Sequence, residues 1–249
     1  MENSKKIFAA NWKLNKTPGE AITFIAEFKK QIADQKDFFL NKEIMIFPSS
    51  FSLDAISKAA IGTEILFGPQ NVYFEKSGAF TGENSADVAK LMGSEIVLIG
   101  HSERRQIFSE TDELLNKKIK LIQSLDLLPV FCVGETLQQR EANETEKICF
   151  SQLEKGLQDI AKDQRLVIAY EPVWAIGTGK VASVEQVASV HLQLSKKLKA
   201  LGFSGFQLLY GGSVKPDNAG ELLQVPHVDG FLIGGASLDP ISFAKICRS

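Results

Sequence analysis

The sequence has little of what marks secreted, membrane-embedded or nucleic-acid-binding proteins. Its 249 residues include only three cysteines, and this odd, widely spaced set predicts free thiols rather than a disulfide framework. No uninterrupted apolar run approaches the roughly 18 residues that a membrane-spanning helix needs. The formal net charge of −2 leaves no basic excess for binding nucleic acid or an anionic membrane. These absences favour a cytoplasmic protein whose main partner is neither nucleic acid nor a membrane.

Candidate metal ligands and targeting signals are also sparse. The three histidines, His101, His191 and His227, are scattered and poorly supplied with cysteine or aspartate neighbours, so no metal site is predicted. Cys132 lies inside an apolar run, where core packing is expected rather than reactivity. Residues Met1–Lys6 lead straight into a short apolar strand without the apolar region of a secretory signal, which again favours the cytoplasm.

What the sequence does contain is a regular alternation of short apolar runs and longer segments of helical period. One unit spans roughly 30 residues, the length of a βα repeat with its crossover. Most of the apolar runs lack an alternating polar face, which is typical of strands covered on both sides. The predicted strands are Ile7–Asn11, Glu43–Phe47, Ile65–Gly68, Ile96–Gly100, Leu128–Val133, Val167–Tyr170, Gln207–Tyr210 and Gly230–Ile233.

The segments between these strands begin with helix-start signals. Thr17–Glu20 has the pattern of a capping box with proline at the first helical position, and Ser183 with Gln186 repeats the box. Ser109 and Asp112 precede a further apolar stripe. Since no linker or composition shift divides residues 1–249, one domain is expected. Eight βα units favour a closed parallel (β/α)8 barrel, the TIM barrel, over an open doubly wound sheet, although the sequence does not show closure.

The barrel predicts that residues just past the carboxyl end of each strand meet at one mouth, where barrel enzymes place their chemistry. Several of those positions are polar or glycine-rich. They are Asn11 and Lys13 after the first strand, His101, Ser102 and Glu103 after the fourth, Glu171 after the sixth, Gly211-Gly212-Ser213 after the seventh and Gly234-Gly235 after the eighth. Such convergence favours a functional site.

The stretch Tyr170–Lys180 has the composition of a base beneath a lid. Glu171 ends an apolar strand, because Pro172 cannot donate to a ladder. Apolar bulk and then a glycine hinge follow, which suits a segment that closes over substrate and excludes water. The apolar lid residues are Val173, Trp174 and Ile176. The alternative is an ordinary surface loop with a glutamate at its start.

The other mouth residues have complementary chemistry. Asn11 and Lys13 alternate along extended chain, so both are expected to face the barrel axis and to stabilise an oxyanion. A helical turn starting at Ser102 would disfavour the charged form of His101. Glu103 is expected to face Lys13 or an arginine, and Arg104 and Arg105 to join an ion-pair cluster rather than react. The glycine turns suit a phosphate, with plain tight turns as the alternative.

The segment Gln70–Glu83 is long and lacks a helical stripe, as functional or disordered loops do. Phe80 is flanked by small residues and followed by Thr81, a composition suited to insertion into a partner. A self-packed Ω-loop is the competing interpretation.

Taken together, these motifs resemble the triosephosphate isomerase family, in its order and over nearly the whole chain. The matching motifs are Ala10–Lys13, Gly100–Arg105, Ala169–Gly179, Tyr210–Val214 and Asp229–Ser237, with Gly78–Glu83 resembling the family's dimer loop. The resemblance implies cofactor-independent interconversion of dihydroxyacetone phosphate and D-glyceraldehyde 3-phosphate through an enediolate, in glycolysis and gluconeogenesis. It also implies a homodimer.

The resemblance assigns roles by residue. Glu171 would be the base, and Lys13, Asn11 and His101 would stabilise the enediolate. Backbone N–H groups of Gly177, Ser213, Gly234 and Gly235 would bind the phosphate, and Ile176 and Leu232 would clamp Glu171. Two rivals are another phosphosugar barrel enzyme, such as an epimerase or synthase, and a catalytically silent barrel. A silent relative should have lost Lys13, His101 or Glu171, and all are present.

Overall fold

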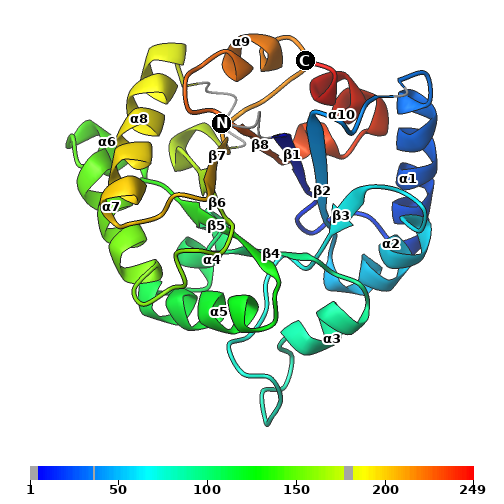
Figure 1. Cartoon of the computed structure of the whole chain (residues 1–249), viewed down its shortest axis with the longest axis horizontal. Coiled ribbons are helices and arrows are strands. Elements are labelled where there is room, and N and C mark those ends of the chain that lie inside the picture. Colours follow the sequence, from blue (N-terminus) through cyan, green and yellow to red (C-terminus); the bar gives the residue numbers. More distant parts are fainter. Residues whose placement is uncertain (1–4, 36, 177–181) are drawn as a thin grey trace.

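A computed structural model describes residues 5–35, 37–176 and 182–249. Viewed down its axis, the chain forms a ring of parallel strands surrounded by helices (Figure 1). The strands are β1 Lys6–Asn11, β2 Lys42–Phe47, β3 Ile65–Phe67, β4 Ile96–Ile99, β5 Leu128–Val133, β6 Leu166–Tyr170, β7 Phe206–Tyr210 and β8 Gly230–Ile233. Each boundary lies within one residue of the boundary that the sequence predicts. The eight-stranded parallel barrel is therefore confirmed.

Backbone hydrogen bonds between β3 and β4, the two strands at the ends of the sheet order, close the barrel. The sheet order is β3-β2-β1-β8-β7-β6-β5-β4, so closure requires β3 and β4 to meet. Glu95 N donates to Phe67 O at 3.2 Å, and Leu98 N donates to Pro69 O at 3.1 Å. These bonds join the two ends of the sheet, and they decide between the closed barrel and the open sheet that the sequence left as an alternative.

Helices cover the outside of the barrel. They are α1 Pro18–Ile32, α2 Leu53–Ala59, α3 Ala86–Leu91, α4 Ser102–Ile107, α5 Asp112–Ser124, α6 Leu137–Glu141, α7 Thr145–Gly156, α8 Val184–Ala200, α9 Ala219–Leu223 and α10 Pro240–Cys247, with 3-10 turns η1 Ser50–Ser52, η2 Val173–Ala175 and η3 Gly235–Ser237. None of the helices in the described part of the chain combines the length and apolar character needed to cross a membrane.

The predicted helix starts are largely confirmed. Capping boxes form at Thr17 with Glu20 and at Ser183 with Gln186. The start of α5 is different, because Thr111 rather than Ser109 is its N-cap and accepts a hydrogen bond from Leu114 N at 3.2 Å. Ser109 instead adopts a φ of 56°, which places it in the preceding turn.

Both faces of the strands are buried, which explains why the sequence shows no polar face. Alternate residues point to opposite sides of a strand. On β1, Ile7 and Ala9 pack inside the barrel, whereas Phe8 and Ala10 pack against the outer helices. Burial of the inner set fills the barrel with side chains, so chemistry is confined to its ends.

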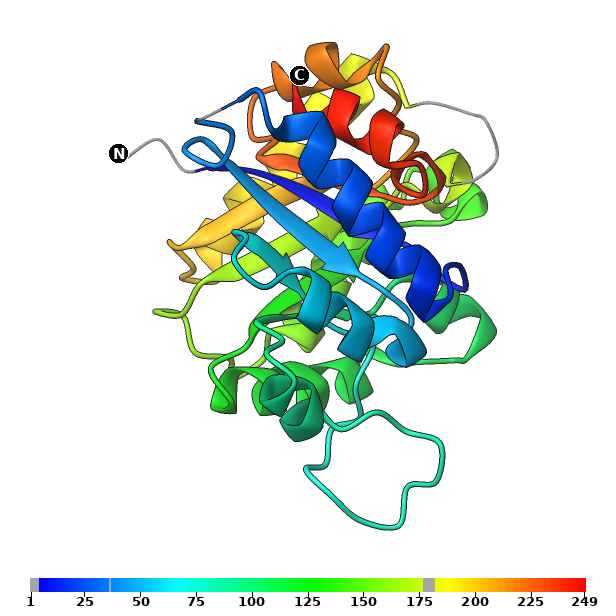
Figure 2. The ribbon, with the colours of Figure 1, turned by 90° about the vertical axis from the view of Figure 1, so that its right-hand side faces the viewer.

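The segment between β3 and α3 projects away from the barrel (Figure 2). Its residues 75–83 are exposed and contain no helix. The ring of Phe80 contacts that of Tyr73, with 4.4 Å between centroids, and Tyr73 contacts Phe74. Even so, Phe80 remains 39% exposed. The loop therefore packs partly on itself and still presents an aromatic edge to solvent.

His191 on α8 is a buried histidine on the outer side of the barrel wall. Its ring lies edge-on to Tyr170, with 5.9 Å between centroids, and its Nδ1 donates to His227 O at 2.9 Å. Full burial removes the solvation of an imidazolium, which lowers the pKa of His191 from 6.5 to about 4.

This lowered pKa predicts a specific acid sensitivity. Between pH 6.5 and 4 the unfolded chain binds a proton at His191 and the folded chain does not, so stability falls as the pH is lowered through this window. The contribution amounts to about 3 kcal/mol of unfolding free energy across the window. Chemical denaturation of the wild type and of His191→Gln at several pH values measures it. The variant should show a shallower loss of stability, and parallel curves would contradict the prediction.

Candidate active site

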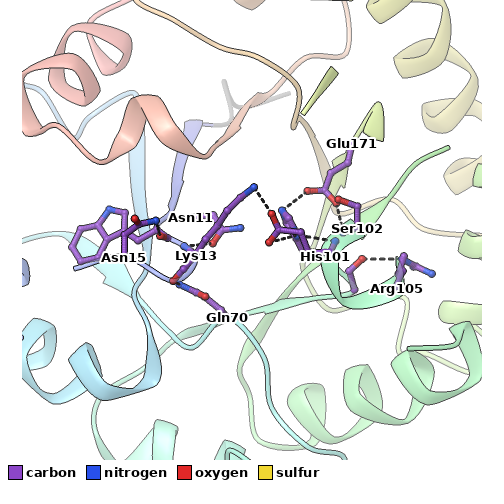
Figure 3. Close-up of polar contacts among 11 residues, drawn as sticks. Asn11, Lys13, Asn15, Gln70, His101, Ser102, Arg105 and Glu171 are labelled. Atoms are coloured by element: carbon purple, nitrogen blue, oxygen red, sulfur yellow. Dashed lines mark hydrogen bonds and ion pairs between the residues drawn. The ribbon is translucent and has the colours of Figure 1, made fainter. Parts of the chain in front are cut away.

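The carboxyl ends of the strands bring the predicted residues together around one cavity. Asn11 ends β1, Lys13 follows it, His101 follows β4 and Glu171 follows β6 (Figure 3). They line a cavity of about 280 Å³, with Ile176, Ser213, Leu232, Gly234 and Gly235 among its other lining residues. Gly177 lies outside the described residues. Every other residue predicted to react or to bind phosphate lines this one cavity.

Glu171 is a buried carboxylate held by the turn after β4. Its Oε2 accepts a hydrogen bond from Ser102 N at 2.8 Å, and its Oε1 lies 2.9 Å from His101 Nε2. The backbone on the other side is close, since a Cβ built at Gly211 would lie 3.0 Å from Glu171 Cγ. Glycine at that position therefore allows the Glu171 side chain to pack closely against the backbone.

His101 is the N-cap of α4, as a helical turn starting at Ser102 required. Its Nδ1 accepts a hydrogen bond from Glu103 N at 3.2 Å. An acceptor at Nδ1 and a donor at Nε2 define one neutral tautomer, which satisfies both Glu103 N and Glu171. The helix start thus orients the imidazole with its N–H directed at the carboxylate.

The expectation that the pKa of His101 would be lowered is wrong for this arrangement. Burial lowers the pKa of His101, but the charge of Glu171, its hydrogen bond to the ring and the charge of Glu103 together raise it above 6.5. Lys13 opposes them only weakly. Of the two carboxylates, only Glu103 is close to His101 in the sequence, two residues further on, whereas Glu171 reaches the ring from the end of β6.

Lys13 reaches the cavity by a different route from the one predicted. It has a φ of 51°, so the chain is left-handed there and not extended. Lys13 N donates to the Asn11 side chain at 3.1 Å, and Gln70 Nε2 donates to Lys13 O at 2.9 Å. This turn still directs both Asn11 and Lys13 into the cavity. Trp12 packs away from it against Phe24.

The charged residues after His101 form the expected ion-pair cluster. Glu103 faces Lys13, as the sequence predicts. The two arginines pair with carboxylates that follow α4 in the chain. The pairs are Lys13–Glu103 at 2.6 Å, Arg104–Glu110 at 2.7 Å and Arg105–Asp112 at 2.6 Å. Glu110 is further paired with the buried Lys118. Lys13 therefore enters the site as a cation that is already partly balanced.

The segment after Glu171 is held by a carboxylate that sequence reasoning missed. Glu135 is fully buried and its Oε1 accepts hydrogen bonds from Trp174 Nε1, Tyr170 Oη and Arg140 Nη1, each at 3.1 Å. Its position directly after β5, following Gly134, was the available signal. Pro172, Val173 and Trp174 therefore begin the loop from an anchored position.

The glycine turns and the apolar residues lie on the cavity wall. Ser213 Oγ donates to Ala175 O at 2.8 Å, which ties the turn after β7 to the segment after β6. A Cβ at Gly234 would lie 3.6 Å from Lys13 Cε, so the turn after β8 approaches the lysine closely. Ile176 and Leu232 line the same cavity as Glu171. The ammonium group of Lys13, the two glycine turns and the carboxylate of Glu171 therefore line the same small cavity.

No group of three or more potential metal ligands of the His, Cys, Asp or Glu type occurs among residues 5–35, 37–176 and 182–249. The three cysteines are buried and free. Burial raises the pKa of the Cys132 thiol, and the charge of nearby Glu171 adds to that increase. Cys132 is therefore core packing, as the sequence predicts, although it lies next to the site.

The family model for triosephosphate isomerase matches residues 6–249. The chain belongs to the triosephosphate isomerase family. A triosephosphate isomerase of Bdellovibrio bacteriovorus is 54% identical over 242 residues, covering 97% of this chain and 98% of that protein. One of Solibacter usitatus is 45% identical, with 97% and 98% covered. The crystal structure of triosephosphate isomerase from Bartonella henselae superposes with a TM-score of 0.88 at 38% identity, covering 98% of each chain.

The contact of Glu171 with His101 is open to a direct test. Glu171→Gln removes the negative charge that faces the ring, so the pKa of His101 should fall below its wild-type value. Nitrogen-15 NMR of the imidazole across pH 5 to 9 measures the titration. Glu103→Gln serves as a comparison, because Glu103 Oε2 is 3.6 Å from Nδ1 and contributes less. An unchanged or higher pKa in Glu171→Gln would rule out the assigned cause.

Proposed function

We propose that this chain, as one domain of residues 1–249, interconverts dihydroxyacetone phosphate and D-glyceraldehyde 3-phosphate through an enediolate, in glycolysis and gluconeogenesis. The observation that carries the proposal is the buried carboxylate of Glu171 facing a cavity that Asn11, Lys13 and His101 also line. The reaction moves a carbonyl between adjacent carbons and is redox-neutral overall. It therefore needs a base and oxyanion stabilisation but no electron-carrying cofactor.

In the proposed mechanism Glu171 leaves Ser102 and His101 and takes a proton from the carbon next to the carbonyl. The electron pair of the C–H bond forms the enediolate double bond, and the carbonyl oxygen gains negative charge. Lys13 and Asn11 stabilise that charge. His101 Nε2–H donates to the enediolate and exchanges a proton between its two oxygens. Glu171 then returns its proton to the neighbouring carbon, so the enzyme regains its starting state.

The enediolate tends to expel phosphate, so the site must hold the phosphate and exclude water. We assign the phosphate to backbone N–H groups of Gly177, Ser213, Gly234 and Gly235. Glycines suit this role because the backbone can approach an anion closely. Ile176 and Leu232 supply the apolar clamp on Glu171, which makes the carboxylate a stronger base when water is excluded.

A coupled isomerase assay on the purified, chelator-treated protein tests the function. The wild type should be active, and Glu171→Gln should lose about 10²- to 10⁴-fold in kcat because its amide cannot accept the proton. Glu146→Gln, an exposed carboxylate on α7, is the matched control and should retain full activity. An inactive wild type would favour the silent barrel, and activity only on an epimerase substrate would favour the rival enzyme class.

We further propose a cytoplasmic homodimer formed through the loop Gly78–Glu83. A second groove of about 880 Å³ opens beside the active site and includes Asn11, Lys13 and His101 in its lining. Exposed apolar side chains flank it, with Leu14 at 96% and Phe51 at 93% exposure. Insertion of the loop of a second copy would cover them and place Thr81 of the partner subunit near Asn11 and Lys13.

The dimer proposal predicts the effect of a charge in this loop. Phe80→Asp would bury a carboxylate in a desolvated interface, so the protein should dissociate and lose activity. Analytical ultracentrifugation at the assay concentration measures the assembly state. Leu40→Asp introduces the same charge at another exposed apolar residue, in the connection before β2, and should leave a dimer. A fully active monomer from Phe80→Asp would refute the dependence of activity on assembly.

A further inference from the structure

Arg105, on α4, ties the end of β4 to the end of β5. Its Nε donates to Gly100 O at 2.8 Å, and its Nη2 donates to Cys132 O at 3.0 Å. Its Nη1 binds Asp112 Oδ1 at 2.6 Å. The side chain is only 15% exposed, and the guanidinium lies 5.5 Å from the centroid of the Phe131 ring. One planar group therefore holds three partners from three successive segments.

The two carbonyl groups lie where the sheet ladder between these strands stops. The register of β4 and β5 runs as far as Ile99 opposite Phe131. Gly100 then turns away with a φ of 74°, while β5 continues through Cys132. A strand that loses its neighbour leaves backbone acceptors in need of donors. Arg105 provides those donors and so extends the junction by one residue on each strand.

This junction includes the two groups that hold Glu171. His101 and Ser102 lie between Gly100 and Arg105, and Arg105 bonds back to Gly100, so this stretch is a closed loop (Figure 3). The loop is also tightened from within, since Arg104 N and Arg105 N donate to His101 O at 2.8 and 3.2 Å. The position of the imidazole relative to β5 is thus fixed through the guanidinium.

We propose that Arg105 is a positioning residue for the isomerase reaction, setting where His101 Nε2 and Ser102 N meet Glu171. The inference rests on the proposed function. Arginine is required by geometry, because a planar fork serves three acceptors in fixed directions and an ammonium group does not. Asp112 fixes the rotation of the fork. A small displacement of reacting groups is costly, which is why a residue that touches no substrate acts on the rate.

Arg105→Lys and Arg105→Ala test the proposal. Both should lower kcat by about ten- to hundredfold, while KM for the triose phosphate stays within about twofold. Added guanidinium ion should restore part of the activity of Arg105→Ala, and urea at the same concentration should not. The matched control is Arg165→Lys. Arg165 makes a similar fork to Glu43 and Gln207 just before β6, away from the mouth, so its loss should reduce stability without changing kcat.

Amide-proton NMR of Arg105→Lys provides a readout that a purely structural role would not move. The amides of Ser102 and Glu103 should shift, because they bond Glu171 and His101. Unchanged amides with unchanged kcat, or an equal fall of kcat in Arg165→Lys, would overturn the proposal. If Arg105→Ala does not fold, Arg105→Lys decides. An inactive wild type would refute the isomerase function instead, and the amide shifts would still decide whether Arg105 positions the loop.

Discussion

The contact of Glu171 with His101 and Ser102 is the interaction on which the rest of the site depends. It places the buried carboxylate at the end of β6 against the first turn after β4. Donors from one strand end therefore stabilise the negative charge at another. The carboxylate receives one backbone and one imidazole hydrogen bond in place of water. In the proposed mechanism the same oxygens leave these donors to take a proton from carbon, so the resting contact has to be firm enough to hold a buried charge and weak enough to break.

Charge balance in the mouth follows from that constraint. Lys13 is partly balanced by Glu103, and Glu171 is paired with His101. A substrate dianion entering this volume can draw Lys13 toward itself, while the displacement of Glu171 from the ring removes the largest influence that raises the pKa of His101. The proposed proton exchange requires a neutral imidazole. Movement of Glu171 from the ring toward the substrate therefore favours the neutral form of His101. The same contact accounts for the raised pKa at rest.

Much of this could be predicted from the sequence, because the determining signals are local. Apolar runs without a polar face located the strands to within one residue, and the capping boxes at Thr17 and Ser183 are fixed by residues three positions apart. Strand ends in a parallel barrel must converge, so the order of the strands alone was enough to place Asn11, His101 and Glu171 at one mouth. The motifs then supplied the family, which no periodicity could have named.

Most of the errors and omissions arise where a residue is determined by partners far away in the chain. The left-handed turn at Lys13 depends on Gln70, and the pKa of His101 depends on Glu171. Glu135 was missed because two of its three donors, Tyr170 and Trp174, lie 35 and 39 residues further along the chain. Ser109 was mistaken for a cap for a local reason, because Thr111, two residues later, competes for the same helix end.

Gln70 and Arg105 have a similar role at opposite sides of the barrel mouth, since the side chain of each binds backbone carbonyl groups at strand ends. Lys13 and His101 lie just beyond the ends of β1 and β4, where the backbone has lost its neighbouring strand. Gln70 donates to Lys13 O and Phe47 O, both at 2.9 Å, and Arg105 donates to Gly100 O and Cys132 O. In each case a side chain adds donors to backbone carbonyls next to a residue of the site, and Phe47 O also accepts a hydrogen bond from Trp12 N at 3.1 Å. The precision of the mouth thus comes from side chains that extend the sheet and not from the sheet alone.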